Sequence, residues 1–113
     1  MKKYLAVYLG TPEKMMNWKP DEATMHKGMM EWGKWVTDHA SAIVDQGSPL
    51  GKTKRIDASG ISDSKNDMGA WAIVQAESHE EAAKMFENHP HFTIFPGDRV
   101  EIMECLPMPK MEM

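Results

Sequence analysis

Two histidines flank a proline in the stretch ENHPHF, and they are the first residues of this sequence that suggest chemistry. His89 and His91 stand on either side of Pro90, close to the end of an expected helix. Imidazole titrates near neutral pH, so a close pair could transfer protons, and it is also a common metal ligand. A third interpretation is a helix end at the surface, where either ring meets the last carbonyls. All three interpretations stay open, with capping or solvent exposure favoured.

A metal at this pair would need further ligands from elsewhere in the chain. The third one would have to be His26, His79 or a carboxylate. The sequence contains no Cys-x-x-Cys and no helical His-x-x-x-His, the spacings typical of zinc sites. We therefore predict no bound metal and no cofactor.

Four more residues complete the candidate set. His26 lies early in an expected long helix, where it could act as a general acid or base; the alternative is an ordinary exposed helical histidine. Trp18 and Trp32 could line a pocket together with the first strand. Trp71 begins an expected strand, and its spacing does not decide which face of the sheet it occupies. The sequence thus predicts His26 and His89 as catalytic residues and Trp18, Trp32, Trp71 and His91 as ligand-binding residues.

The elements that must position these residues follow from apolar spacing. Period-two alternation predicts strands, three- and four-residue spacing predicts a helix, and Ser78 with Glu81 forms a capping box that opens a second helix. Gly47 is a stop signal, and residues 57–67 form a turn-rich connection. In order, the expected elements are a strand at 3–9, a loop to 19, a helix at 20–46, strands at 52–57 and 69–77, a helix at 78–88 and a strand at 99–105.

This β-α-β-β-α-β order predicts an α+β, ferredoxin-like fold with two helices on one face of a four-stranded antiparallel sheet. Two helices cover only one face of such a sheet. Because the strands also carry apolar residues on the other face, we expect a homodimer that packs sheet against sheet.

Length and charge limit the class of protein. The chain has 113 residues, which suits one domain, expected at 1–106 with a flexible tail at 107–113. A net charge of −4 argues against nucleic acid as a partner. A single cysteine and the absence of a long apolar segment predict a soluble cytoplasmic protein without a membrane partner.

Several segments together resemble those of YCII-related proteins, a family that includes a branch with a DGPF motif. The segments are KKYLAVYLG, GSPLG, NDMGAWAIVQAES and HPHFTIFPGDRVEIMEC. The resemblance covers nearly all of residues 3–105 and implies a dimeric α+β barrel. The activities of the family are poorly defined, and at least one relative is linked to dehydrochlorination of an aromatic ring.

The same resemblance bears on two of the candidate residues. His26 matches a histidine that family members carry early in the first helix, where it is suspected of proton transfer. An acidic residue precedes the later proline in relatives, whereas His89 occupies that position here, and the DGPF string is absent. The resemblance implies a cofactor-free proton-transfer, elimination or isomerisation enzyme acting on a small molecule such as an aromatic compound. The alternative is a non-catalytic dimeric module that binds a small ligand or another protein.

Overall fold

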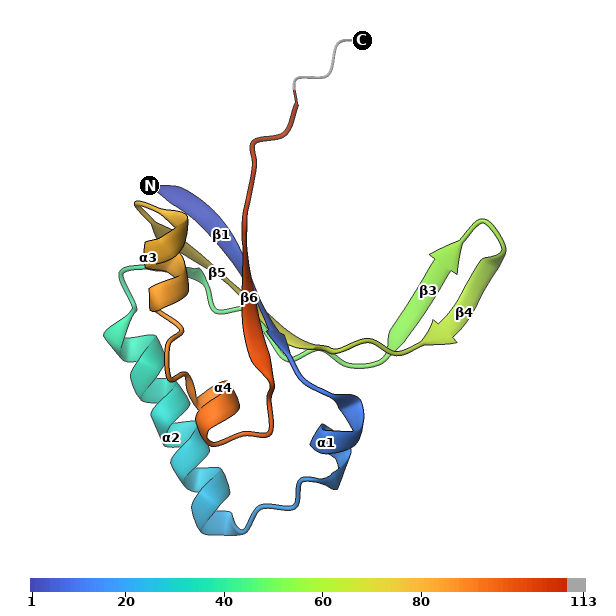
Figure 1. Cartoon of the computed structure of the whole chain (residues 1–113), viewed down its shortest axis with the longest axis horizontal. Helices are drawn as coiled ribbons and strands as arrows, with labels where there is room; N and C mark the ends of the chain where they lie inside the picture. The colour runs from blue at the N-terminus through green and yellow to red at the C-terminus, as the bar shows by residue number, and fades with distance from the viewer. Residues whose placement is uncertain (110–113) are drawn as a thin grey trace.

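The structure, a computed structural model, describes residues 1–109 and has an antiparallel sheet with helices on one face (Figure 1). The strand order β2-β5-β1-β6 is that of a ferredoxin-like α+β fold, which confirms the predicted fold class. The sheet strands are β1 (Lys2–Leu9), β2 (Ile43–Asp45), β5 (Met68–Ala76) and β6 (Arg99–Glu104). The remaining elements are α1 (Pro12–Asn17), α2 (Glu22–Asp38), α3 (His79–Lys84), α4 (Pro90–Thr93) and a separate hairpin of β3 (Thr53–Asp57) and β4 (Gly60–Ser64).

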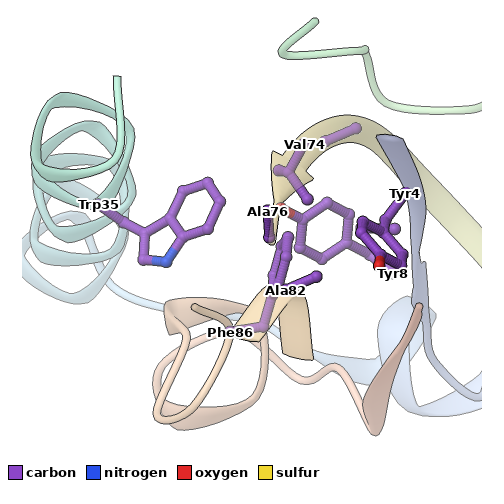
Figure 2. Packing of buried hydrophobic residues seen from close by; sticks show 9 residues of the cluster. Tyr4, Tyr8, Trp35, Val74, Ala76, Ala82 and Phe86 are labelled. Carbon is purple, nitrogen blue, oxygen red and sulfur yellow. The ribbon is translucent and has the colours of Figure 1, made fainter. Parts of the chain in front are cut away.

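The hydrophobic core lies between the sheet and the helices. The alternation that the sequence predicts for β1 turns Tyr4, Ala6 and Tyr8 toward the helices, a choice of face that the sequence leaves open. Beside them on the same face of the sheet, β5 contributes small residues, and the large rings of Trp35 and Phe86 pack against this face from the helices (Figure 2). The Trp35 indole also donates a hydrogen bond to the Met85 carbonyl at 2.7 Å, which ties α2 to the end of α3. The β5 residues on this face are Ala72, Val74 and Ala76.

The long helix is shorter than the sequence predicts. Its start is capped by Asp21, whose carboxylate accepts the Thr24 N–H at 2.7 Å. It ends at Asp38 instead of Gln46, and the His39 ring donates to the Trp35 carbonyl at 2.8 Å. The residues that follow pair with β5 and become β2, because an extended conformation gives their backbone partners in the sheet. Gly47, with φ of 69°, therefore turns the chain after a strand and not after a helix.

The second sheet strand is consequently not the predicted one. We expected residues 52–57 in the sheet, but β3 pairs only with β4, and this hairpin projects away from the body (Figure 1). We call residues 53–64 the arm. Its tight turn uses Gly60 with φ of 115° and an Asp57 carboxylate that accepts the Ser59 N–H. The region predicted as a turn-rich connection thus contains β4.

Two other local expectations differ from the structure. The predicted loop after β1 contains α1, and Asp98 accepts hydrogen bonds from the Thr11 backbone and hydroxyl and from Lys14, which fixes this helix to the segment before β6. The predicted helix at 78–88 begins as expected, since the Ser78 hydroxyl accepts the Glu81 N–H, but α3 ends at Lys84.

The free edge of the sheet at β6 carries one side-chain contact. Directly after β6, the Cys105 N–H donates to the Lys3 carbonyl of β1, so by alternation the carbonyl of Ile102 points away from β1. The His79 ring donates to this carbonyl at 2.7 Å. Beyond β6, residues 107–109 of the predicted tail are exposed and irregular, and the rest of that tail lies outside the described residues.

Candidate active site

His89 and His91 are buried, which corrects the expectation of a capped helix end or a solvent-exposed turn. His89 is 0% exposed and His91 is 5% exposed. The chain leaves α3, passes Asn88 in a left-handed conformation (φ 58°) and starts α4 at Pro90. Proline suits the first position of a helix as well as the end of one. His89 is therefore the N-cap of α4 and not a C-terminal cap of the preceding helix.

Hydrogen bonds fix the proton of each ring. The Nδ1 atom of His89 accepts the backbone N–H of His91 at 3.0 Å, so the proton of the neutral His89 ring lies on Nε2. That Nε2–H points at the hydroxyl of Tyr8, 3.4 Å away. The Nε2–H of His91 donates to the Leu9 carbonyl at 2.8 Å, because a carbonyl can only accept. Both imidazoles are thus neutral donors held against β1.

Burial keeps these groups uncharged at neutral pH. Desolvation, together with the nearby His91 and His39, lowers the pKa of His89 to about 3. Protonation of Nδ1 would also place a second donor against the His91 N–H and break this hydrogen bond, which lowers the pKa of His89 further. Burial lowers the pKa of His91 as well, although the backbone carbonyls near its ring oppose the shift. Burial raises the pKa of the Tyr8 hydroxyl.

The His91 ring lies directly on Gly97. A side-chain carbon at that position would come within 2.2 Å of the imidazole, so only glycine leaves room for the ring. The Gly97 N–H also donates to the His91 carbonyl at 2.9 Å. The segment from His91 to Gly97 is therefore folded tightly onto itself beside the end of β1.

Aromatic rings enclose the two histidines. The His89 ring meets Trp32 at 4.5 Å and Trp35 at 4.6 Å, both edge to face, and stacks on Phe86 at 5.8 Å. Tyr8 lies within 5.3 Å of both imidazoles. We call this set the histidine cluster: Tyr8, Trp32, Trp35, Phe86, His89 and His91.

A row of half-buried rings leads from the cluster to the surface. Trp32 contacts Phe95 at 5.8 Å, and Phe95 contacts Trp18 at 5.3 Å. Trp18 and Phe95 are both partly exposed. Gly28 of α2 faces the Phe95 ring so closely that a larger residue there would collide with it. This row therefore joins the buried cluster to partly exposed rings.

A hollow of about 520 Å³ opens beside the cluster, between α2 and α4. Trp35 and Pro90 belong to both its wall and the surroundings of His89. Charged residues of α2 form its rim. The lining consists of Lys27, Glu31, Lys34, Trp35, Asp38, Asn88, Pro90, Thr93 and Ile94.

The structure brings together some of the sequence candidates and separates others. Trp18, Trp32, His89 and His91 lie in the cluster or in the row that leads to it. His26 is exposed on α2, and no described hydrogen bond or ring contact joins it to His89 or His91. Trp71 pairs with Val7 on the opposite face of the sheet, because its neighbours Ala70 and Ala72 face the helices.

Sequence reasoning missed Trp35 and Phe86 of the cluster and three further residues of this region. Tyr8 and Gly97 contact the histidines from β1 and from the turn before β6, and Phe95 links Trp32 to Trp18. The alternation of β1 indicates the face that Tyr8 occupies, but no local signal indicates a partner 81 residues away.

Residues 1–109 hold no group of three or more His, Cys, Asp or Glu side chains that could bind a metal ion. In the same residues, the helices are all too short or too polar to cross a bilayer. The absence of a metal and of a cofactor stays a prediction.

Comparison with known proteins supports the fold. No protein-family model matches the sequence, and neither does any curated protein. Among solved structures, 5-chloro-2-hydroxyhydroquinone dehydrochlorinase (TftG) from Burkholderia phenoliruptrix AC1100, in complex with 2,5-dihydroxybenzoquinone, is 17% identical over 88% of this chain and 89% of its own, with a TM-score of 0.54. This likeness shows the fold alone.

A second solved structure overlaps less well. Ribosomal protein S6 from Thermotoga maritima is 11% identical over 92% of this chain and 87% of its own, with a TM-score of 0.41. At that score the overlap adds nothing to the fold assignment.

Proposed function

We propose that this chain binds a small aromatic or quinonoid molecule where β1, α2 and α4 meet, and acts on it by proton transfer without a cofactor. The hydrogen-bonded pair of Tyr8 and His89 supports this proposal most directly. It places two polar groups inside a shell of aromatic rings, the composition that small-molecule sites share. The dehydrochlorinase, whose structure contains a dihydroxybenzoquinone, adds a ligand class to test.

Tyr8 carries the proposed chemistry. The His89 Nε2–H donates to the Tyr8 oxygen, so the Tyr8 hydrogen is free to point at the carbonyl or phenolate oxygen of a ligand. A donor in a buried, weakly polar site stabilises developing negative charge on such an oxygen more than a donor in water does. His89 then acts as a positioning residue, because its ring is held neutral.

Access to Tyr8 would come along the row of half-buried rings. Trp18 and Phe95 meet edge to face at 5.3 Å, and both are partly exposed. A flat molecule could replace Phe95 against Trp32 and stack there. The hollow beside α4 has Lys27 and Lys34 on its rim, either of which could pair with a phenolate oxygen, together with Glu31 and Asp38, which balance their charge.

His26 keeps the acid-base role that the resemblance implies only as a proposal. Its ring is exposed on α2, so it could act only on a substrate that lies at the helix surface or under a second copy of the chain. The sequence-based homodimer is also retained as a proposal, because the face of the sheet opposite the helices carries Leu5, Ile73 and Met103 in one row across three strands.

Binding without turnover is the second candidate function. It is favoured by the fixed rings of His89 and His91: burial lowers the pKa of both, to about 3 for His89, so the neutral form of each ring is favoured at neutral pH. A protein with such a site would hold an aromatic ligand without changing it.

Titration with 2,5-dihydroxybenzoquinone, followed by tryptophan fluorescence, tests the binding site. We expect quenching that saturates, and a Tyr8→Phe variant that binds about tenfold more weakly, the effect of one lost hydrogen bond of about 1.4 kcal/mol. Tyr4→Phe, a buried tyrosine of the same strand and face, is the control and should bind normally. No saturable quenching by the unaltered protein would contradict the proposal.

Chloride release separates the two candidate functions. If the protein is an enzyme of this kind, it should release chloride from 5-chloro-2-hydroxyhydroquinone, and Tyr8→Phe should slow the release. Binding with no chloride release supports the binding module for this substrate. Loss of release in His26→Ala, with binding unchanged, would return the catalytic role to His26.

A further inference from the structure

The arm presents an apolar face that nothing in its own chain covers. Ile56 and Ile61 are directly opposite each other in β3 and β4 and are 75% and 72% exposed. On the same face, Lys54 and Asp63 are paired opposite each other and form an ion pair beside the isoleucines. The other face carries Thr53, Arg55, Asp57, Ser62 and Ser64. The arm is therefore amphipathic, with one apolar pair on one side.

An isolated two-stranded hairpin is only marginally stable in water. Packing of its apolar face on another surface would stabilise it. The arm extends away from the body in Figure 1, and the long dimension of the molecule is 57 Å. The radius of gyration is 16.3 Å, whereas a compact chain of this length would have about 13 Å. Within one copy, the arm is not folded back onto the body.

The same chain has a second uncovered apolar surface. Ile73, Leu5 and Met103 are neighbours across β5, β1 and β6 on the face opposite the helices, and we call them the outer row. Met103 is 43% exposed, and Leu5 and Ile73 are half-buried. On the next row, Trp71 is half-buried and extends this apolar surface, whereas its partner Val7 is only 7% exposed.

Charges beside the two surfaces match. Beside the Ile56–Ile61 pair of the arm, Lys54 and Asp63 form an ion pair. On the outer face of the sheet, Arg99 and Glu101 form another ion pair. Each surface therefore offers one positive and one negative group beside an apolar patch. In a twofold arrangement, each contact of an arm with a sheet face occurs twice, so the two surfaces of one chain can satisfy those of another.

We infer that the arm packs its Ile56–Ile61 face on the outer face of the sheet in a second copy of this chain. This inference rests on the proposed homodimer and adds to it a reciprocal clasp: each arm reaches over the edge of the sheet-to-sheet interface onto its partner. The arm is joined to β5 by a connection of only three residues, 65–67, so it starts at the margin of the face that the partner would cover.

Disulfide trapping between two distinguishable chains tests the clasp. Both chains carry Cys105→Ser, which removes the native exposed thiol, and tags of different mass. One chain carries Ile61→Cys and the other Met103→Cys. The matched control replaces Ile61→Cys by Ser62→Cys, which lies next to it on the opposite face of the arm. Mild oxidation and mass spectrometry measure the mixed disulfide.

We expect the Ile61→Cys chain to give at least fivefold more mixed disulfide than the Ser62→Cys chain. Equal yields, or no mixed product from a chain that light scattering shows to be a dimer, overturn the clasp and leave the homodimer standing. A chain that is monomeric at every concentration overturns both. The ligand titrations above need no dimer to be informative, so failure here is distinguishable from failure of the proposed binding site.

Discussion

The histidine cluster and the arm depart from ordinary burial in opposite directions. In the cluster, two imidazoles that usually stay in contact with water lie inside the protein, and His89 is 0% exposed. In the arm, two isoleucines that usually lie inside a core stand in water, and Ile56 is 75% exposed. One region buries polar groups, and the other exposes apolar ones.

The difference lies in whether the chain itself satisfies the unusual residues. Each buried imidazole has partners within the same copy, since His89 accepts the His91 N–H and His91 donates to the Leu9 carbonyl. A buried polar group with its hydrogen bonds made costs little. The exposed isoleucines have no such internal partner in the described residues. The cluster is therefore complete in one chain, whereas the arm leaves its two isoleucines exposed, which is why we propose that a second copy covers them.

The largest effect should come from filling the space beside His91. Gly97→Ala would place a carbon within 2.2 Å of the imidazole, and we expect a loss of about 3 kcal/mol in the free energy of unfolding. Urea unfolding measures it. The control is Gly33→Ala in α2, where no atom lies within 4 Å of the added carbon and where alanine should stabilise by about 0.5–1 kcal/mol. An unchanged Gly97→Ala protein would mean that the ring does not lie on this glycine.

A smaller effect should appear when pH changes. The pKa of His89 is about 3 in the folded chain against 6.5 in the unfolded one. Below pH 6.5, the unfolded chain binds a proton at His89 that the folded chain does not bind. The free energy of unfolding therefore decreases as the pH is lowered, until the folded ring itself titrates. The slope should be up to about 1.4 kcal/mol per pH unit. Burial of His91 adds in the same direction.

Urea unfolding between pH 4.5 and 7 measures this slope. His89→Asn is the matched variant, because an asparagine at an N-cap can still accept the His91 N–H but does not titrate. Its stability should change less with pH than that of the unaltered protein, whereas His26→Ala should keep the full slope. The lowered pKa values of Asp21 and Asp98 act at more acidic pH than this window. An equal slope in the His89→Asn variant would contradict the buried neutral ring.

The smallest effect on stability should come from the arm. Replacing both Ile56 and Ile61 by threonine keeps β propensity and removes apolar surface that is already in water. We expect the free energy of unfolding of the dilute monomer to change by less than about 0.5 kcal/mol. A loss of several kcal/mol would show that the arm packs within its own chain.

The sequence predicts the fold well where one pattern has one meaning. The alternation of β1, β5 and β6 and the Ser78 cap all appear in the structure close to their expected bounds. It fails at residues 39–46, where apolar residues at helical spacing also suit a strand and pairing with β5 decides the outcome. At residues 52–57 it predicts the strand correctly but not its pairing, which is with β4 alone. Proline misleads in the same way: Pro90 was expected to end one helix, and it also begins another.

The candidate site could be predicted only in part, for a related reason. Residue type and spacing identify His89, His91, Trp18 and Trp32, because each is unusual where it stands. They do not identify Tyr8 or Gly97 as partners, since those contacts join segments far apart in the chain. Burial is equally a tertiary property: it turns a histidine pair that looked titratable into one held neutral.

The hydrogen bond from His79 to the Ile102 carbonyl has a consequence for how copies of this chain meet. It occupies an acceptor on the free edge of β6, where another strand would otherwise pair. At the opposite edge, β2 has only three residues and is followed by a proline that bridges to Ala70. Both margins of the sheet thus resist the addition of strands. We therefore expect the proposed homodimer to form through the broad surface of the sheet, and we expect strand-by-strand growth at its edges to be disfavoured.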